Sequence, residues 1–492
     1  MGKQQKTSPR PTGRGSVLGD TARAETAPAS PSRWILSPVH DWLLFIGAPV
    51  VCILTLLPLR VVWTSEQIAI LLLAFFTFGH HFPGFLRAYG DRELFARYRW
   101  RFLLAPPIIF GTALWFDARQ LHGLIVFVFA WDIWHVLMQQ YGFMRIYDSK
   151  QGVTSPFISR LDLAFALCWY LTLIVESPAY RHNLLSRAYM TGLPLMSTPV
   201  FAAIRIAMIG ATGILTLFYV GYHLYLWRRG QPVSFRKLTL VGIFLAATYF
   251  LYDYIDDFVV GFCVWSAFHC VQYYAIVWAF NRSRVDRKRP VTALVQFLFR
   301  PRISLVLLYA SLILAYGGIN YLIPFASDEN LRRWLLAFVF TSNALHYYYD
   351  GFIWKVREPD TRQYLNIAPA ATARLADRFR WARRDWVHAA GFAAVIAMLG
   401  ALETWAPHAE VAMQQSLVAV APEIAEARYN LGNALWREGR LAEAAGTYRE
   451  ALERKPLAKI HSNLGAVLYD SGQLDEAIKE YREALSLSGS TA

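Results

Sequence analysis

The chain has 492 residues, of which 55% are hydrophobic and 15% aromatic, and its apolar residues form long unbroken blocks. A soluble core shows spaced apolar stripes instead, so this composition indicates a membrane protein and excludes an ordinary soluble domain. Lys and Arg outnumber Asp and Glu by 49 to 35, and much of the excess lies in short segments between apolar blocks. Such clusters are typical of contact with membrane lipids at the cytoplasmic surface, and we expect no nucleic-acid partner.

The N-terminal segment, residues 1–33, is rich in Pro, Ser, Thr, Gly and Arg and has no apolar periodicity. It cannot bury enough surface to fold, so we expect a disordered basic tail. We do not expect a secretory signal here, because the apolar core of a signal follows a short basic stretch, whereas this first apolar block comes only after some 40 residues.

The next segment, residues 34–405, is predicted to be a polytopic membrane domain. A spanning helix needs about 20 mostly apolar residues, and about eleven blocks meet that need, so the predicted fold class is all-α. The predicted spans are 40–59, 67–86, 102–117, 122–144, 159–177, 201–227, 238–255, 258–280, 303–324, 333–354 and 387–405.

The basic residues predict the direction of these spans. Successive hydrophilic segments, from the N-terminal tail to the stretch before the last span, contain 6, 1, 5, 1, 3, 2, 4, 0, 7, 2 and 8 Lys and Arg residues. Segments with many basic residues favour the cytoplasmic side. We therefore expect a cytoplasmic N-terminus and an external C-terminal domain, which in a bacterial inner membrane lies in the periplasm.

A soluble helical pattern begins near residue 425 and repeats. Six residues recur 33 positions later, which pairs Leu431 with Leu464, Gly432 with Gly465, Gly439 with Gly472, Ala444 with Ala477, Tyr448 with Tyr481, and Ala451 with Ala484. This order of small and aromatic residues resembles the tetratricopeptide repeat (TPR) family. The sequence departs from the family pattern in two places. Arg428 stands where an aromatic residue is usual, and the second unit has no closing Pro. Residues 409–422 fit the second helix of a degenerate earlier repeat.

The resemblance implies that residues 406–492 form a helical-repeat domain that docks a protein partner. It implies nothing about chemistry. The alternative is that so short an array serves only as a structural cap on the last membrane helix, since about three units are usually needed for stability.

Histidines mark the candidate site. Six of the twelve histidines lie inside predicted spans, and all six are on even-numbered spans: His80, His81, His135, His223, His269 and His346. These spans are predicted to run from outside to inside, and each histidine precedes the basic residue that ends its span by about 5 to 13 positions. At 1.5 Å per residue, this range of positions corresponds to about 12 Å along the helix axis. The histidines are therefore predicted to lie in the cytoplasmic half of the membrane. We expect a subset of them to converge.

Acidic residues accompany two of these histidines at helical spacing. Asp132 precedes His135 by three residues, and Asp350 follows His346 by four, so each pair shares a helix face. Ionisable groups in hydrocarbon are costly unless paired and normally face the bundle interior. We predict a transition-metal site with the six histidines as candidate ligands, and with Asp132 and Asp350 as catalytic candidates that bind the metal or orient a ligand. A proton or ion pathway, or hydrogen bonds that merely join helices, are the alternatives.

The histidine spacing lacks the H-x3-H and H-x2-H-H boxes of membrane di-iron enzymes and the paired histidines of b-type cytochromes. Ligands from several helices still suit iron, which we favour, or copper, manganese or zinc. The leading hypothesis is a metal-dependent oxidoreductase that acts on a lipid-like substrate. The alternatives are a non-enzymatic transporter or membrane assembly factor that recruits a partner through the repeats, and a lipid-linked glycosyltransferase.

Overall fold

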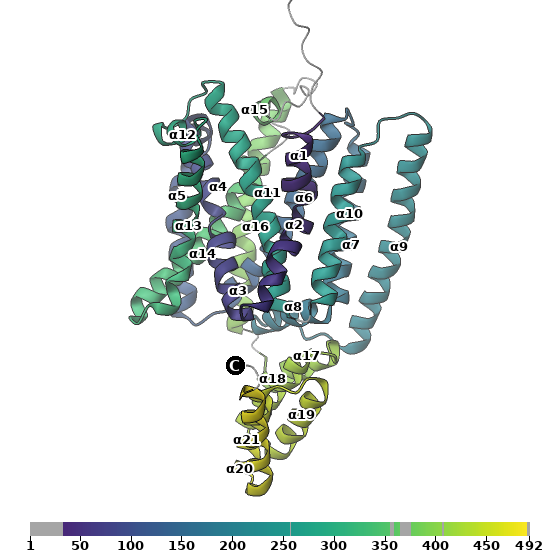
Figure 1. Ribbon diagram of the computed structural model, residues 1–492, viewed down its shortest axis with the longest axis vertical. Helices are drawn as coiled ribbons and strands as arrows, with labels where there is room; N and C mark the ends of the chain where they lie inside the picture. The colour runs from purple at the N-terminus through teal and green to yellow at the C-terminus, as the bar shows by residue number, and fades with distance from the viewer. Residues whose placement is uncertain (1–32, 256, 355–358, 365–374, 406–407, 490–492) are drawn as a thin grey trace, which may run out of the picture.

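A computed structural model of the chain describes residues 33–255, 257–354, 359–364, 375–405 and 408–489 (Figure 1). All named elements within these ranges are helices, and the strand-like pairing there is an isolated bridge between Asp91 and Val291. The predicted tail, residues 1–33, lies almost wholly outside the described residues.

The helices form two groups, a large bundle and a smaller unit at one end of it. The first half of the bundle comprises α1 (Pro38–Asp41), η1 (Trp42–Ile46), α2 (Ala48–Leu56), η2 (Leu57–Val61), α3 (Ser65–Leu71), η3 (Leu72–Phe78), α4 (His81–Gly90), α5 (Arg92–Ala118), α6 (Gly123–Lys150), α7 (Pro156–Glu176) and α8 (Pro178–Met190). The second half comprises α9 (Thr198–Arg228), α10 (Phe235–Tyr249), η4 (Phe250–Tyr254), α11 (Phe258–Asp286), α12 (Ala293–Leu298), α13 (Ile303–Tyr321), η5 (Ile323–Phe325), α14 (Glu329–Ile353), α15 (Pro359–Tyr364) and α16 (Leu375–Trp405).

Seven of the described helical segments are long and apolar enough to cross a membrane, and the number rises to nine if two bent helix pairs each count as one span. The predicted spans 102–117 and 333–354 lie on α5 and α14, which are not among the seven. Both are long enough, but α5 begins with a basic turn and α14 carries histidine, asparagine and acidic residues. The count of eleven spans therefore stays a prediction.

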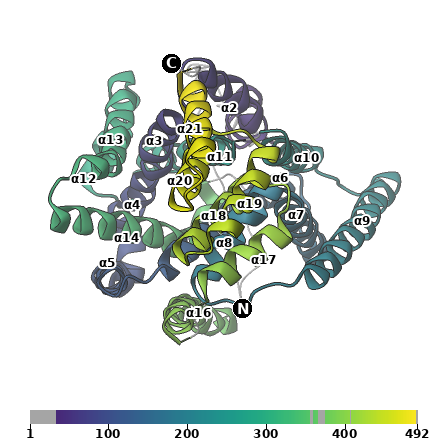
Figure 2. The same cartoon turned by 90° about the horizontal axis from the view of Figure 1, so that it is seen from below.

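Helix α11 is the centre of the bundle. It packs against α2, α3, α4, α6 and η3, and its inward side chains include the fully buried Trp265 and Phe268. A second apolar cluster joins α5, α6, α14 and α16 and includes one buried ring from each helix: Phe102, Phe127, Tyr349 and Phe392. By contrast, α9, α13 and α16 lie at the periphery of the bundle (Figure 2).

The smaller unit consists of five helices: α17 (Glu410–Val420), α18 (Ala425–Arg437), α19 (Leu441–Arg454), α20 (Ala458–Asp470) and α21 (Leu474–Gly489). The turn glycines Gly439 and Gly472 both have a left-handed backbone, with φ of 75° and 79°, which a glycine adopts without strain. They separate α18 from α19 and α20 from α21, so the two predicted repeats are two helical hairpins.

Candidate metal centre

Four segments that are distant in sequence bring one histidine each to a common point in the bundle. His80 lies between η3 and α4, His135 on α6, His269 on α11 and His346 on α14. All four rings are buried, and one ligand nitrogen from each lies within 4.8 Å of the others. The structure thus brings together four of the six histidines that the sequence singles out.

His80 and its neighbour His81 both lie inside the bundle, next to an irregular stretch of the helical path. Successive residues of a regular α-helix point about 100° apart, so both would not face the same interior. Here the π-helical segment η3 ends before Gly79, and α4 begins at His81. Irregular turns of this kind often occur at functional sites.

Two of the distances between ring nitrogens are compatible with a pair of ligands on one ion. His346 Nε2 lies 2.9 Å from His80 Nε2 and 3.1 Å from His135 Nε2. Two nitrogens that each lie about 2.0–2.1 Å from a metal are separated by about 2.9 Å at a right angle and about 3.3 Å at the tetrahedral angle.

Hydrogen bonds among the rings do not satisfy all these nitrogens. His80 Nδ1 donates to the Thr77 carbonyl, so in the neutral ring Nε2 carries a lone pair that faces the other histidines. His346 Nε2 can form a good hydrogen bond with one neighbouring ring, not with two. Both nitrogens of His269, and Nδ1 of His346, have no hydrogen-bond partner in the described part of the chain. Buried polar atoms are normally paired, so this donor set fits a cation.

Asp350, one turn after His346 on α14, is oriented toward the same point. Its Oδ2 lies 3.7 Å from His135 Nε2 and 3.8 Å from His346 Nε2. Its Oδ1 accepts a hydrogen bond from the Tyr273 hydroxyl at 3.0 Å, and Trp354 Nε1 donates to that same tyrosine oxygen at 3.3 Å. These bonds hold the carboxylate where it can serve as an oxygen ligand or accept a proton.

Asp132 lies beside the four histidines rather than among them. Its Oδ1 accepts a hydrogen bond from the Tyr347 hydroxyl at 3.2 Å, and the Tyr347 ring lies 5.3 Å from the His135 ring. Its Oδ2 is buried and has no partner among the described groups. The sequence-based assignment of Asp132 as a catalytic group therefore stays a prediction.

His81 also lies at the edge of the cluster. Its ring stacks on His346 at 4.7 Å, its Nδ1 contacts the Ser342 hydroxyl at 2.8 Å, and its Nε2 has no partner among the described residues. Ser342 in turn contacts the Tyr316 hydroxyl at 2.7 Å. The structure thus places His81 against a ligand candidate without bringing its nitrogens to the common point.

His223 is the predicted ligand that the structure places elsewhere. Its Nδ1 contacts the Tyr219 carbonyl at 2.9 Å, and its Nε2 lies 3.3 Å from the Lys237 ammonium. Both nitrogens are therefore engaged within a different polar cluster on α6, α7, α9 and α10. The ligand set that this geometry supports excludes His223.

That second cluster is a buried ion-pair network which sequence reasoning missed. Lys237 is only 1% exposed, and its ammonium contacts Asp148 at 3.2 Å and Asp162 at 3.0 Å; Arg145 also contacts both carboxylates. Lys237 and the half-buried Arg145 balance the two buried carboxylates, which makes the burial of these charges tolerable. In the sequence, Lys237 is one of several basic residues between two apolar blocks. Such residues usually reflect the orientation of the spans, so no local pattern identifies Lys237 as a buried charge.

Two family models, both described as tetratricopeptide repeat, match the C-terminal end of the chain, at residues 409–459 and 458–490. Residues 409–490 are tetratricopeptide repeats. The TPR prediction is confirmed, and the match includes the earlier helix that was expected at residues 409–422. No curated protein matches the chain, and no solved structure does.

The TPR unit is joined to the bundle through α8. The buried Arg181 donates from Nε to the Val420 carbonyl at 2.8 Å and pairs with Glu423 at 2.6 Å, so it binds the end of α17. The Ser416 hydroxyl donates to the Met196 carbonyl at 3.1 Å. These bonds attach the repeats to the end of the bundle at which α8 lies (Figure 1).

Proposed function

We propose that this chain is a multi-pass membrane protein with about eleven spans, and that its four-histidine centre binds a transition metal, with iron favoured. The proposed activity is oxidation of a lipid-like substrate with molecular oxygen as the oxidant. The TPR unit is proposed to recruit a protein partner on the periplasmic side of a bacterial inner membrane, with the N-terminus in the cytoplasm.

Exposed apolar side chains support insertion into a membrane. On the peripheral helix α9, Ile206, Ile214 and Leu217 are 72%, 73% and 78% exposed. Water-soluble proteins rarely expose contiguous apolar surface of this kind, whereas lipid solvates it.

The metal proposal rests mainly on the position of His346 Nε2, which lies close to Nε2 of both His80 and His135. This nitrogen lies 2.9 Å and 3.1 Å from two other imidazole nitrogens, distances that suit two ligands of one metal ion. In addition, both buried nitrogens of His269 have no hydrogen-bond partner among the described residues. Imidazole ligands with a nearby carboxylate suit iron, copper, manganese and zinc, and an iron centre of this kind supplies activation of oxygen.

The residues of the chain have separable roles in this proposal. His80, His135, His269 and His346 hold the ion, and Thr77 sets the tautomer of His80. Tyr273 and Trp354 orient Asp350, whose Oδ2 faces the nitrogens. Asp132 Oδ2 is positioned to hold a proton, because Tyr347 occupies only Oδ1. The burial of all four rings excludes water from the centre.

Elemental analysis of the purified full-length protein in detergent tests the proposal. We expect about one transition-metal ion per chain in the wild type, and a loss of nearly all of it in His269→Ala and His346→Ala. The matched control is His223→Ala, another histidine inside the bundle, which should keep its metal. Size-exclusion chromatography checks that each variant remains folded. A wild-type protein without stoichiometric metal, or an equal loss in the control, would overturn the proposal.

A further inference from the structure

The segment that carries His80 is less regular than those of the other three histidines of the cluster. His135, His269 and His346 each lie within a long α-helix, whereas His80 follows the π-helical η3 and precedes α4. In a regular helix the backbone hydrogen bonds fix where a side chain points, but here the bonding pattern changes at the histidine itself. Contacts from outside the segment must then hold His80 in place.

Two side chains of the central helix α11 hold the end of η3. The Tyr274 hydroxyl donates a hydrogen bond to the Phe76 carbonyl at 2.9 Å, and this oxygen also accepts the backbone N–H of His80 at 3.1 Å. The hydroxyls of Ser266 and Thr77 lie 3.0 Å apart, within hydrogen-bond distance. Two consecutive residues of η3 are thus bonded to α11.

The carbonyls of Phe76 and Thr77 belong to adjacent peptide groups, and the second of them orients the imidazole. The Thr77 carbonyl accepts the hydrogen bond from His80 Nδ1, so that Nε2 faces the other histidines. Each peptide group is planar, and the two groups share one Cα atom, so a bond that fixes the first carbonyl restricts the second. The Tyr274 hydroxyl therefore acts on the imidazole through the backbone.

The preceding residue, Tyr273, supports another flank of the same centre. Its hydroxyl donates to Asp350 on α14, whereas that of Tyr274 donates to η3. Successive residues of an α-helix point about 100° apart, so the two adjacent tyrosines reach different elements. One of them holds the candidate carboxylate, and the other holds the segment of a candidate imidazole ligand.

We propose that Tyr274 is a positioning residue of the metal centre, whose hydroxyl holds the end of η3 so that His80 keeps its place among the four histidines. The inference rests on the proposed metal site and adds to it a residue that binds no metal itself. The Tyr274 ring packs with Phe82 and Trp278 against an apolar cluster, so the hydroxyl can be removed while the packing of the ring is kept.

Binding of Co²⁺ to the full-length protein in detergent tests this role, because the visible absorption of the ion reports both occupancy and ligand geometry. Tyr274→Phe should bind Co²⁺ about ten-fold more weakly in competition with a chelator. It should also change the absorption spectrum of the fully loaded protein, which a merely structural role in the bundle would leave as it is. Wild-type affinity in Tyr274→Phe, or an unchanged spectrum, would overturn the inference.

The matched control is Tyr309→Phe. Tyr309 is buried on α13 in the same apolar cluster, and its hydroxyl has no hydrogen-bond partner among the described residues. Removal of this hydroxyl should leave both the affinity for Co²⁺ and the spectrum as in the wild type, and equal losses in the two variants would also overturn the inference. A wild type without stoichiometric Co²⁺ would overturn the metal proposal as well, so the two failures are distinguishable.

Discussion

A single side chain, His346, connects most of the groups at the centre. Its Nε2 faces His80 and His135, its ring stacks on His81, and one turn later α14 provides Asp350. These contacts require α4 and α11 to approach α14 closely, and a glycine on α4 makes that approach feasible. A Cβ built at Gly84 would lie 2.6 Å from the Tyr273 hydroxyl and 3.5 Å from His346 Nδ1.

Substitution of this glycine should therefore disturb the centre. Gly84→Ala should push the Tyr273 hydroxyl away from Asp350, lower the free energy of unfolding by about 1–3 kcal/mol, and reduce the bound metal. Thermal unfolding in detergent and elemental analysis measure the two effects. Gly142→Ala on α6 is the control, because a Cβ there meets nothing within 4 Å and a helical alanine is slightly stabilising. The explanation fails if the two variants behave alike.

At the scale of elements, helix irregularities and small residues set which faces meet. The π-helical η3 precedes the His80–His81 pair, and α13 packs against it at Gly317, where a Cβ would lie 2.6 Å from the Ala74 carbonyl oxygen. A side chain at Gly317 would separate these two helices. At the other end of the bundle, the short helix α8 carries both Arg181, which binds the TPR unit, and the buried His182.

The buried His182, on the helix that binds the TPR unit, predicts that the stability of the folded protein depends on pH. Burial lowers the pKa of His182 from 6.5 to about 4; Glu426 on α18 opposes this shift and Arg187 adds to it. The folded protein therefore holds the neutral ring, while the unfolded chain takes up a proton below pH 6.5. Stability from this group is complete above pH 6.5 and is lost as the pH falls toward 4.

The expected loss between pH 7.5 and 4.5 is about 1–3 kcal/mol in the free energy of unfolding. Unfolding midpoints of the full-length protein at both pH values measure it. His182→Gln has no proton to gain, so its midpoint should fall less than that of the wild type. Equal falls in the two proteins would show that another group causes the pH dependence.

At the scale of the whole molecule, the most basic connections and the TPR unit lie at opposite ends of the bundle. The short helices α12 and α15 lie in or beside the two most basic connections, and both lie at the end of the bundle opposite the TPR unit (Figure 1). The basic end is the expected cytoplasmic end, because membrane proteins retain Lys and Arg there. The TPR unit is then expected to be external.

Labelling of single cysteines tests this orientation. A cysteine at the exposed Ser471, in the TPR unit, should react with an impermeant maleimide in intact spheroplasts. A cysteine at the exposed Gln231, in the basic connection after α9, should react only after the membrane is permeabilised. Native Cys52, Cys263 and Cys270 are buried, and wild-type protein serves as the background control. The reversed pattern would invert the topology.

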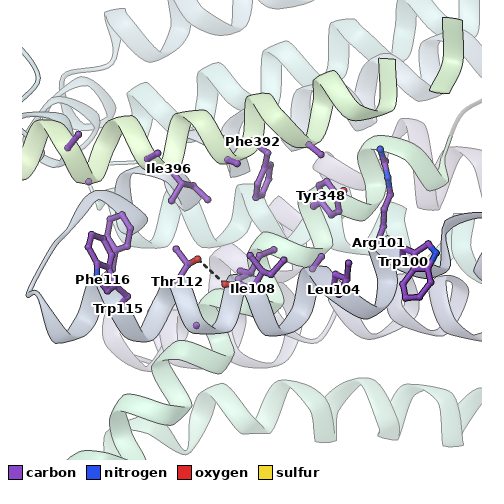
Figure 3. Close-up of a pocket in the computed structure, with 18 of the residues that line it drawn as sticks. Trp100, Arg101, Leu104, Ile108, Thr112, Trp115, Phe116, Tyr348, Phe392 and Ile396 are labelled. Atoms are coloured by element: carbon purple, nitrogen blue, oxygen red, sulfur yellow. Dashed lines mark hydrogen bonds between the residues drawn. The ribbon is translucent and has the colours of Figure 1, made fainter. Parts of the chain in front are cut away.

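Composition and short-range pattern are enough to predict the all-helical class, the apolar blocks and the TPR unit, because block length and a 33-residue recurrence are properties of the chain order. Sequence patterns do not distinguish His346 from His223, since each is a histidine inside an apolar block. Only the packing of the helices assigns one to a cluster of imidazoles and the other to Lys237. His80 and His346 are 266 residues apart, and no local rule specifies which helix faces meet across that distance. The same packing places α5 beside α16, so that a groove forms between two helices that are far apart in the sequence (Figure 3).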